Sequence, residues 1–343
     1  MPAGLAADHH GAIADLLPGD EETWHGPMVA RPRRPRPSGR GRPPGGGSSG
    51  PPPTPIRCRG LRSGAVTEPS LDRFVVTDDG VRLAFSVRGE GEPLLMIPGL
   101  GATRRVYAPI IPALARRHRV IVYDPRGVGD SDVPGGPYPM PRLAADCVAV
   151  STAAGAPGFQ LFGASMGGLT AEHVAVLHPG RVTRLVLAAT GSGRHATVPA
   201  APEATAALLG RGAATPAEAY RLACSVLYSP RFQRDHPEFI EDEVAYRASH
   251  PIPGRAFIAQ FRSSRDADVS GRLGEIAVPS LVLHGAEDVL VPLANAETLT
   301  KLIPGARRYW FDGCGHLFFH EAPRLTVEVI LSFLAGGGSS AAS

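Results

Sequence analysis

Short apolar runs alternate with helical patterns over much of the chain. Each run that is typical of a buried strand is rich in Val, Leu, Ile or Phe: residues 94–97, 119–123, 159–162, 182–188 and 278–283. Apolar residues with a helical period lie between the earlier runs, at residues 105–116, 140–154 and 166–178. Strands that alternate with helices predict right-handed crossovers and a mostly parallel sheet with helices on both faces, an α/β fold.

The first strands depart from this alternation. Residues 74–77 and 81–87 flank Asp78-Asp79-Gly80. An Asp-Gly pair between two such runs is a strong hairpin signal. The sheet is therefore expected to begin with an antiparallel pair.

Residues 191–275 carry helical patterns without a strand pattern. Thr215-Pro216-Ala217-Glu218 has the N-cap, first-turn Pro and third-position Glu that begin a helix. The segment is too long for a simple crossover, so we expect a helical cap there. The predicted core then has two parts, residues 66–190 and residues 276–343.

The N-terminal region has a different composition. Residues 31–55 are dominated by Arg, Pro, Gly and Ser. Such a segment cannot bury enough apolar surface to offset the entropy of ordering, so we expect residues 1–65 to form a disordered tail. Arg33-Arg34 is followed by no apolar stretch, which argues against an export signal. We further expect that translation begins near Val66, just before the first strand.

Charge and cysteine content exclude several classes of protein. Lys and Arg number 35 against 32 Asp and Glu, a near balance that does not indicate a nucleic-acid partner. No run of about 18 apolar residues predicts a membrane span. The four cysteines are widely scattered and have no C-x-x-C spacing: Cys58, Cys147, Cys224 and Cys314. This pattern argues against a zinc site and against a disulfide framework. We expect a cytoplasmic protein without metal or cofactor, and no pattern indicates its oligomeric state.

The most specific motif is Gly163-Ala164-Ser165-Met166-Gly167. It follows an apolar run and opens an alanine-rich helical pattern, which is the context of a nucleophile elbow. There a sharp strand-to-helix turn lifts a serine hydroxyl above the sheet, and glycines tolerate the crowded backbone. Ser165 is therefore the candidate nucleophile.

A serine nucleophile needs a general base and an acid that orients the base. Asp288 follows the strand pattern at residues 278–283, and His316 ends a glycine-rich loop after a later apolar run. They complete the chain order Ser, Asp, His. Glu287 is the nearest substitute for the acid. Cys314 is a rival nucleophile without an elbow, so we assign it to packing.

An oxyanion hole needs two backbone N–H donors, one after the nucleophile and one from the loop after an early strand. Met166 supplies the first. Leu100, in Pro98-Gly99-Leu100-Gly101, supplies the second.

Over roughly residues 71–335 the chain resembles the α/β-hydrolase superfamily, in particular capped single-chain members such as carboxylesterases, enol-lactonases and carbon–carbon bond hydrolases. This resemblance rests on the elbow and on the segment at residues 124–131, which is similar to the family's D-x-R-G-x-G-x-S loop. The resemblance implies that this loop is mainly structural. Pro98 replaces the histidine that usually opens the oxyanion loop, so the usual side-chain brace of that loop is missing.

These features predict a serine hydrolase that cleaves a small-to-medium apolar ester or lactone through an acyl-enzyme. An enol-lactonase or carbon–carbon bond hydrolase with the same triad is the alternative, and a non-hydrolytic ligand-binding protein is the alternative of another class. Most aromatic residues of the cap are expected in its own core. The candidate substrate contacts are Tyr228, Phe257, Phe261 and Leu317.

Overall fold

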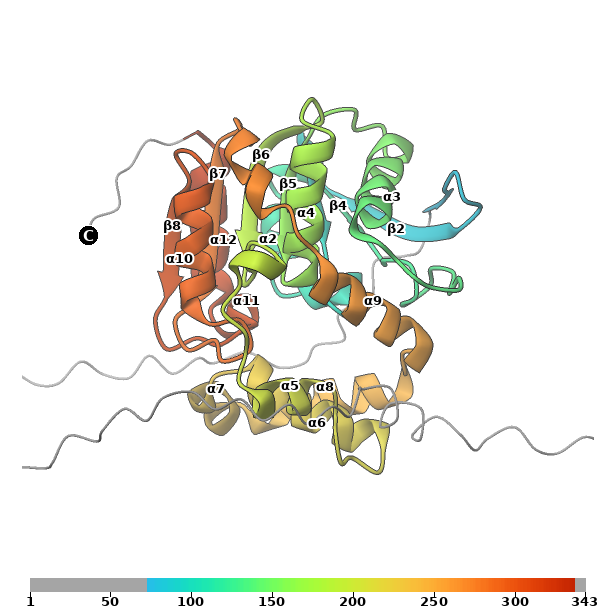
Figure 1. The fold of residues 1–343 in the computed structure, drawn as a ribbon, viewed down its shortest axis with the longest axis vertical. Helices are drawn as coiled ribbons and strands as arrows, with labels where there is room; N and C mark the ends of the chain where they lie inside the picture. Colours follow the sequence, from blue (N-terminus) through green and yellow to red (C-terminus); the bar gives the residue numbers. More distant parts are fainter. Residues whose placement is uncertain (1–72, 337–343) are drawn as a thin grey trace, which may run out of the picture.

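The computed structural model describes residues 73–336 (Figure 1). The predicted tail at residues 1–65, and with it Cys58 and the expected start near Val66, lies outside the described residues. Within residues 73–336, no helix combines the length and the apolar character that are needed to cross a bilayer.

One sheet of eight strands forms the centre of the molecule, in the order β1-β2-β4-β3-β5-β6-β7-β8. The strands are β1 (Arg73–Val76), β2 (Arg82–Arg88), β3 (Glu92–Ile97), β4 (His118–Tyr123), β5 (Phe159–Ala164), β6 (Val182–Ala188), β7 (Ser280–Gly285) and β8 (Arg307–Phe311). β2 pairs antiparallel with β1 and β4, and all other neighbours are parallel. This confirms the predicted hairpin and the mostly parallel sheet.

Helices cover both faces of the sheet. One face carries α3 (Met140–Ala153), α4 (Met166–Leu177) and α10 (Leu293–Leu302), and the other carries α2 (Ile111–Leu114) and α12 (Pro323–Leu334). Side chains alternate along the buried strands: in β3, Leu95 and Ile97 join the first core, whereas Leu94 and Met96 join the second. The predicted α/β fold with helices on both faces is confirmed.

The prediction of one helix at residues 105–116 was wrong. A short 3-10 helix, η1 (Arg104–Tyr107), and the single turn of α2 stand in its place. Pro109 lies between them and lacks the N–H that a continuous helix would need. The other predicted elements of the core differ from the observed bounds by a residue or two.

Between β6 and β7 the chain forms a layer of helices at one end of the sheet (Figure 1). We call them the inserted helices: α5 (Pro202–Leu208), α6 (Pro216–Leu227), α7 (Pro230–Asp235), α8 (Pro237–Ser249) and α9 (Gly254–Asp266). As expected, Thr215 caps α6, its hydroxyl accepting a hydrogen bond from the Glu218 N–H at 3.2 Å. The inserted helices have a small apolar core of their own, built from Cys224, Tyr228, Phe232, Ile240 and Val244.

The two ends of the insertion lie side by side. Gly193 and Asp268 form an isolated antiparallel bridge, and the Arg194 N–H donates to the Ala267 carbonyl at 2.8 Å. Two short 3-10 helices, η2 (Arg194–Ala196) and η3 (Ser270–Glu275), flank this neck.

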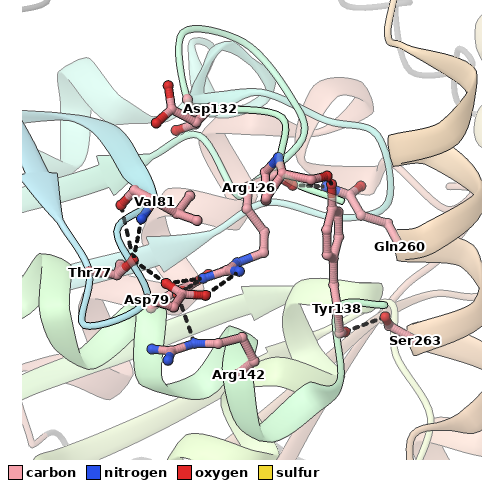
Figure 2. A network of polar contacts seen from close by, with 12 residues as sticks. Thr77, Asp79, Val81, Arg126, Asp132, Tyr138, Arg142, Gln260 and Ser263 are labelled. Carbon is pink, nitrogen blue, oxygen red and sulfur yellow. Dashed lines mark hydrogen bonds and ion pairs between the residues drawn. The ribbon is translucent and has the colours of Figure 1, made fainter. Parts of the chain in front are cut away.

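A buried arginine secures the loop after β4. The Arg126 Nε and Nη2 atoms each donate to Asp146 on α3 at 2.6 Å. The Arg126 Nη1 atom donates to Asp79 in the β1–β2 turn at 2.9 Å (Figure 2). Arg126 and Asp146 are almost completely buried. The guanidinium therefore ties three separate segments together, a structural role for this loop.

We expect Arg126→Ala to lower the free energy of unfolding by about 3–5 kcal/mol, because it leaves the Asp146 carboxylate buried without its main partner. Urea unfolding monitored by circular dichroism measures the change. Arg221→Ala is the control, since its ion pair with Glu241 is exposed and should leave the urea midpoint unchanged. Equal midpoints for the two variants would contradict this account.

Candidate active site

Ser165 lies at the turn between β5 and α4 with a strained backbone. Its φ of 56° and ψ of −122° are rare for a residue with a side chain. The Ser165 N–H donates to the Ala188 carbonyl at 2.9 Å, and its own carbonyl accepts from the Thr190 hydroxyl at 2.9 Å. These bonds to the end of β6 and the loop after it hold the turn, and the side chain stays half-exposed.

The glycines of the motif are required by close backbone contacts. A Cβ atom on Gly163 would lie 2.2 Å from the Gly167 carbonyl oxygen, and one on Gly167 would lie 2.1 Å from the carbonyl oxygen of Ile97. No side chain fits at either position. The turn at Ser165 therefore packs directly against the end of β3.

Asp288 and His316 meet at the ends of β7 and β8. The His316 Nδ1 atom lies 2.7 Å from Asp288 Oδ2. Asp288 Oδ1 accepts hydrogen bonds from the N–H groups of Leu290 at 2.9 Å and Val291 at 2.8 Å. Both side chains are buried. The carboxylate is thus fixed by backbone donors and faces the imidazole.

A second histidine lies near the same carboxylate. His284, within β7, is buried, and its Nε2 atom lies 2.7 Å from the Val291 carbonyl oxygen and 3.4 Å from Asp288 Oδ2. Burial lowers the pKa of His284, which favours the neutral ring. A neutral ring that donates from Nε2 to Val291 supports the turn that holds Asp288.

The loop that carries His316 is held on two sides. The Glu287 N–H donates to the Cys314 carbonyl at 2.9 Å, which ties the loop to the end of β7. The Leu317 N–H donates to the Leu227 carbonyl at 2.9 Å, which ties it to the inserted helices. His316 therefore lies where core and insertion meet.

The structure gives no hydrogen bond between Ser165 and His316 within the described residues. A cavity of about 420 Å³ lies beside Ser165, and Leu290 and Val291 line it as well. The two residues whose amides hold Asp288 thus belong to the wall of the cavity that Ser165 also lines. Ser165, Asp288 and His316 all follow strands at the carboxyl ends of the parallel sheet.

Leu100 and Met166 pack in the same small apolar cluster. A Cβ atom on Gly99, the residue before Leu100, would lie 3.2 Å from Ser165 Cβ. The loop after β3 therefore runs directly past the serine, where an oxyanion donor is needed.

Two inserted helices hold this loop. The Gly101 N–H donates to Gln260 Oε1 on α9 at 2.8 Å, and the Gly101 carbonyl accepts from Arg247 Nη1 on α8 at 2.6 Å. Gln260 is fully buried, and its Nε2 donates to the Arg126 carbonyl at 2.9 Å (Figure 2). The brace that Pro98 cannot supply comes from the insertion. Neither Gln260 nor Arg247 belongs to a motif, so the sequence analysis missed both.

The family model for the alpha/beta hydrolase fold matches residues 92–323. The chain belongs to this family. Alpha/beta hydrolases share the arrangement described above, in which candidate catalytic residues follow the strands of a mostly parallel sheet.

Proteins that are similar to this chain have names that refer to different substrates. A putative carbamate hydrolase of Azorhizobium caulinodans is 30% identical over 253 residues, which cover 73% of this chain and 94% of the relative. The 3-oxoadipate enol-lactonase 2 of Acinetobacter baylyi is 29% identical over 66% of this chain and 84% of its own. The crystal structure of the esterase RhEst1 from Rhodococcus sp. ECU1013 is 28% identical with a TM-score of 0.68, covering 78% of this chain and 99% of the esterase.

The four candidate substrate contacts lie outside the lining of the cavity beside Ser165. Tyr228 is buried in the core of the inserted helices, its hydroxyl 3.0 Å from His320 Nδ1. Phe257 packs against Gly101, and Phe261 is half-buried on α9. Leu317 packs between the core and the insertion. A role of these residues in substrate binding stays a prediction.

The rival candidates have less suitable surroundings. Glu287 is exposed, and the described contacts join His316 to Asp288 instead. Cys314 is buried, which raises the pKa of its thiol to about 12. Among residues 73–336, no group of three or more His, Cys, Asp or Glu side chains is placed to hold a metal ion.

We expect Cys314 of the native protein to resist iodoacetamide. A thiol with a pKa of about 12 is ionised in roughly one molecule in ten thousand at pH 8, and the thiolate is the reactive form. Peptide mass spectrometry should find Cys314 unmodified until denaturant is added. Rapid alkylation of the native protein at Cys314 would revive it as a candidate nucleophile.

Proposed function

We propose that this hydrolase cleaves a small-to-medium carboxylic ester or lactone through an acyl-enzyme formed on Ser165. The observation that carries the proposal is the strained turn at Ser165 at the same sheet edge as the hydrogen-bonded pair of His316 and Asp288. Strained backbone at a half-exposed serine indicates a functional constraint, because ordinary packing does not require it.

In the proposed first step, His316 Nε2 takes the proton of the Ser165 hydroxyl as the oxygen attacks the acyl carbon. The hydrogen bond from Nδ1–H to Asp288 leaves Nε2 unprotonated and stabilises the imidazolium that forms. The N–H groups of Met166 and Leu100 stabilise the oxyanion. His316 then protonates the leaving group.

In the second step, a water molecule takes the place of the leaving group. His316 removes its proton, and the hydroxide attacks the acyl carbon of the Ser165 ester. The bond to Ser165 Oγ breaks, His316 returns the proton to this oxygen, and the acid is released. A lactone follows the same course, with its alcohol and acid remaining in one molecule.

Three relatives are named for a carbamate, an enol-lactone and an ester. Each of these bonds has an acyl carbon next to a heteroatom that leaves. The names therefore support hydrolysis at an acyl carbon, and the choice of an ester or lactone rests on the nucleophile and the apolar surroundings of the site.

We expect Ser165→Ala to lower the turnover of a short 4-nitrophenyl ester by at least about 1000-fold, because the attacking oxygen is removed. Release of 4-nitrophenolate measures the rate. Ser225→Ala is the control, since this serine on α6 is exposed and its hydroxyl donates to the Leu222 carbonyl. Undiminished turnover by Ser165→Ala would reject the mechanism.

A fluorophosphonate separates the enzyme from a ligand-binding protein that retains the fold. We expect stoichiometric labelling at Ser165, because the reagent needs an activated serine and an oxyanion hole. A folded protein that is not labelled would instead support the ligand-binding function.

Gln260→Leu tests the brace of the oxyanion loop. We expect kcat to fall by about 10-fold or more with little change in KM. The loss of the bond to Gly101 displaces the Leu100 N–H, the proposed oxyanion donor, which acts mainly in the transition state. Gln233→Leu is a matched control, since Gln233 donates to the Tyr228 carbonyl within the inserted helices and does not touch the loop. A fall in kcat that is equal in the two variants, or explained by lost thermal stability, would contradict a positioning role.

A further inference from the structure

The cavity beside Ser165 has an unequal distribution of charge. Its wall includes two arginines, Arg194 from η2 and Arg265 from the end of α9, and no aspartate or glutamate. The remaining lining is apolar or neutral and includes Ser165, Met166, Leu169, Val198 and Asn295. A ligand in this cavity therefore meets two arginines and no carboxylate in the lining.

The two guanidinium groups retain capacity for a ligand. Arg194 forms no ion pair with any residue in the described part of the chain. Arg265 pairs with Asp266, the next residue, but the two side chains are 59% and 52% exposed, so water weakens this pair. Asp268, also close in sequence, pairs with His195.

The wall that carries Arg194 is held in place. The Asn295 side chain accepts from the Val198 N–H at 2.6 Å and donates to the Val198 carbonyl at 2.9 Å. On the other side, the Arg194 N–H bonds Ala267, near the end of α9 that carries Arg265. The backbone that carries Arg194 is thus held between Val198 and the end of α9, and both arginines belong to the lining of the cavity.

A guanidinium group binds a carboxylate through paired N–H donors, a match of geometry as well as charge. His316 protonates the leaving group in the proposed mechanism and is not part of this wall. The cavity therefore takes the acyl side of the substrate. Its volume of about 420 Å³ suits a short chain.

We propose that Arg194 and Arg265 form a carboxylate-binding subsite, and that the preferred substrates are esters or lactones whose acyl chain ends in a carboxylate. This inference rests on the proposed function and refines its substrate class. The apolar wall contacts the methylene groups of the chain, and the arginines bind its far end.

A matched pair of esters tests the subsite. The probes are 4-nitrophenyl hydrogen pimelate, which has a terminal carboxylate, and 4-nitrophenyl octanoate, which has an apolar chain of similar length. We expect kcat/KM of the full-length protein to favour the pimelate by about 10-fold or more at low salt, mainly through KM. The preference should shrink in 0.5 M NaCl, because salt screens exposed charges.

Arg194→Gln and Arg265→Gln should each reduce the ratio of the two kcat/KM values several-fold, and the double variant should abolish the preference. Arg262→Gln is the matched control: this exposed arginine is also on α9 but lies outside the cavity lining, so the ratio should not change. If Gln substitution lowers kcat/KM for both esters by one factor, the arginines act on the fold and the subsite is overturned.

Failure of the subsite is distinguishable from failure of the proposed function. Equal kcat/KM for the two esters, with Ser165 labelled by a fluorophosphonate, overturns the subsite and leaves the esterase mechanism intact. Absence of turnover with either ester, together with absence of labelling, overturns both.

Discussion

The site depends on a steric limit at the turn between β5 and α4. Gly163 and Gly167 leave no room for a Cβ atom, so the first turn of α4 packs directly on the backbone of β5 and on the end of β3. The positive φ of Ser165 costs on the order of 1–3 kcal/mol, which the surrounding packing and the bonds to Ala188 and Thr190 must offset. Because of this close approach, the loop after β3 passes directly beside the serine.

The sequence predicted the parts of the site that depend on local patterns. Ser165, Asp288 and His316 each follow a strand whose apolar run is plain in the sequence, and the structure joins Asp288 to His316. The prediction of a helix at residues 105–116 failed because it followed the apolar period and neglected Pro109, whose missing N–H interrupts a continuous helix. Gln260 could not be found in advance, since its contact with Gly101 joins segments far apart in the chain and belongs to no motif.

The insertion contacts the loop after β3 and also lines the cavity beside Ser165. Arg247 and Gln260 bond the carbonyl and the N–H of a single residue, Gly101, so the inserted helices hold the loop after β3 in position. The same insertion supplies Arg265 to the wall of the cavity. If the loop after β3 supplies the oxyanion donor and Arg265 binds substrate, as we propose, a shift of α9 that admits a larger acyl group would also move the Gly101 amide.

The bridge between Gly193 and Asp268 has a consequence for how such proteins diverge. Because the insertion leaves and rejoins the core at adjacent backbone positions, β6 and β7 pair in the same register whatever the length of chain between them. The catalytic core can then accept a different set of helices as a module, much as a surface loop accepts an insertion. Relatives with one shared chemistry and many substrates are the expected product of exchange at this neck.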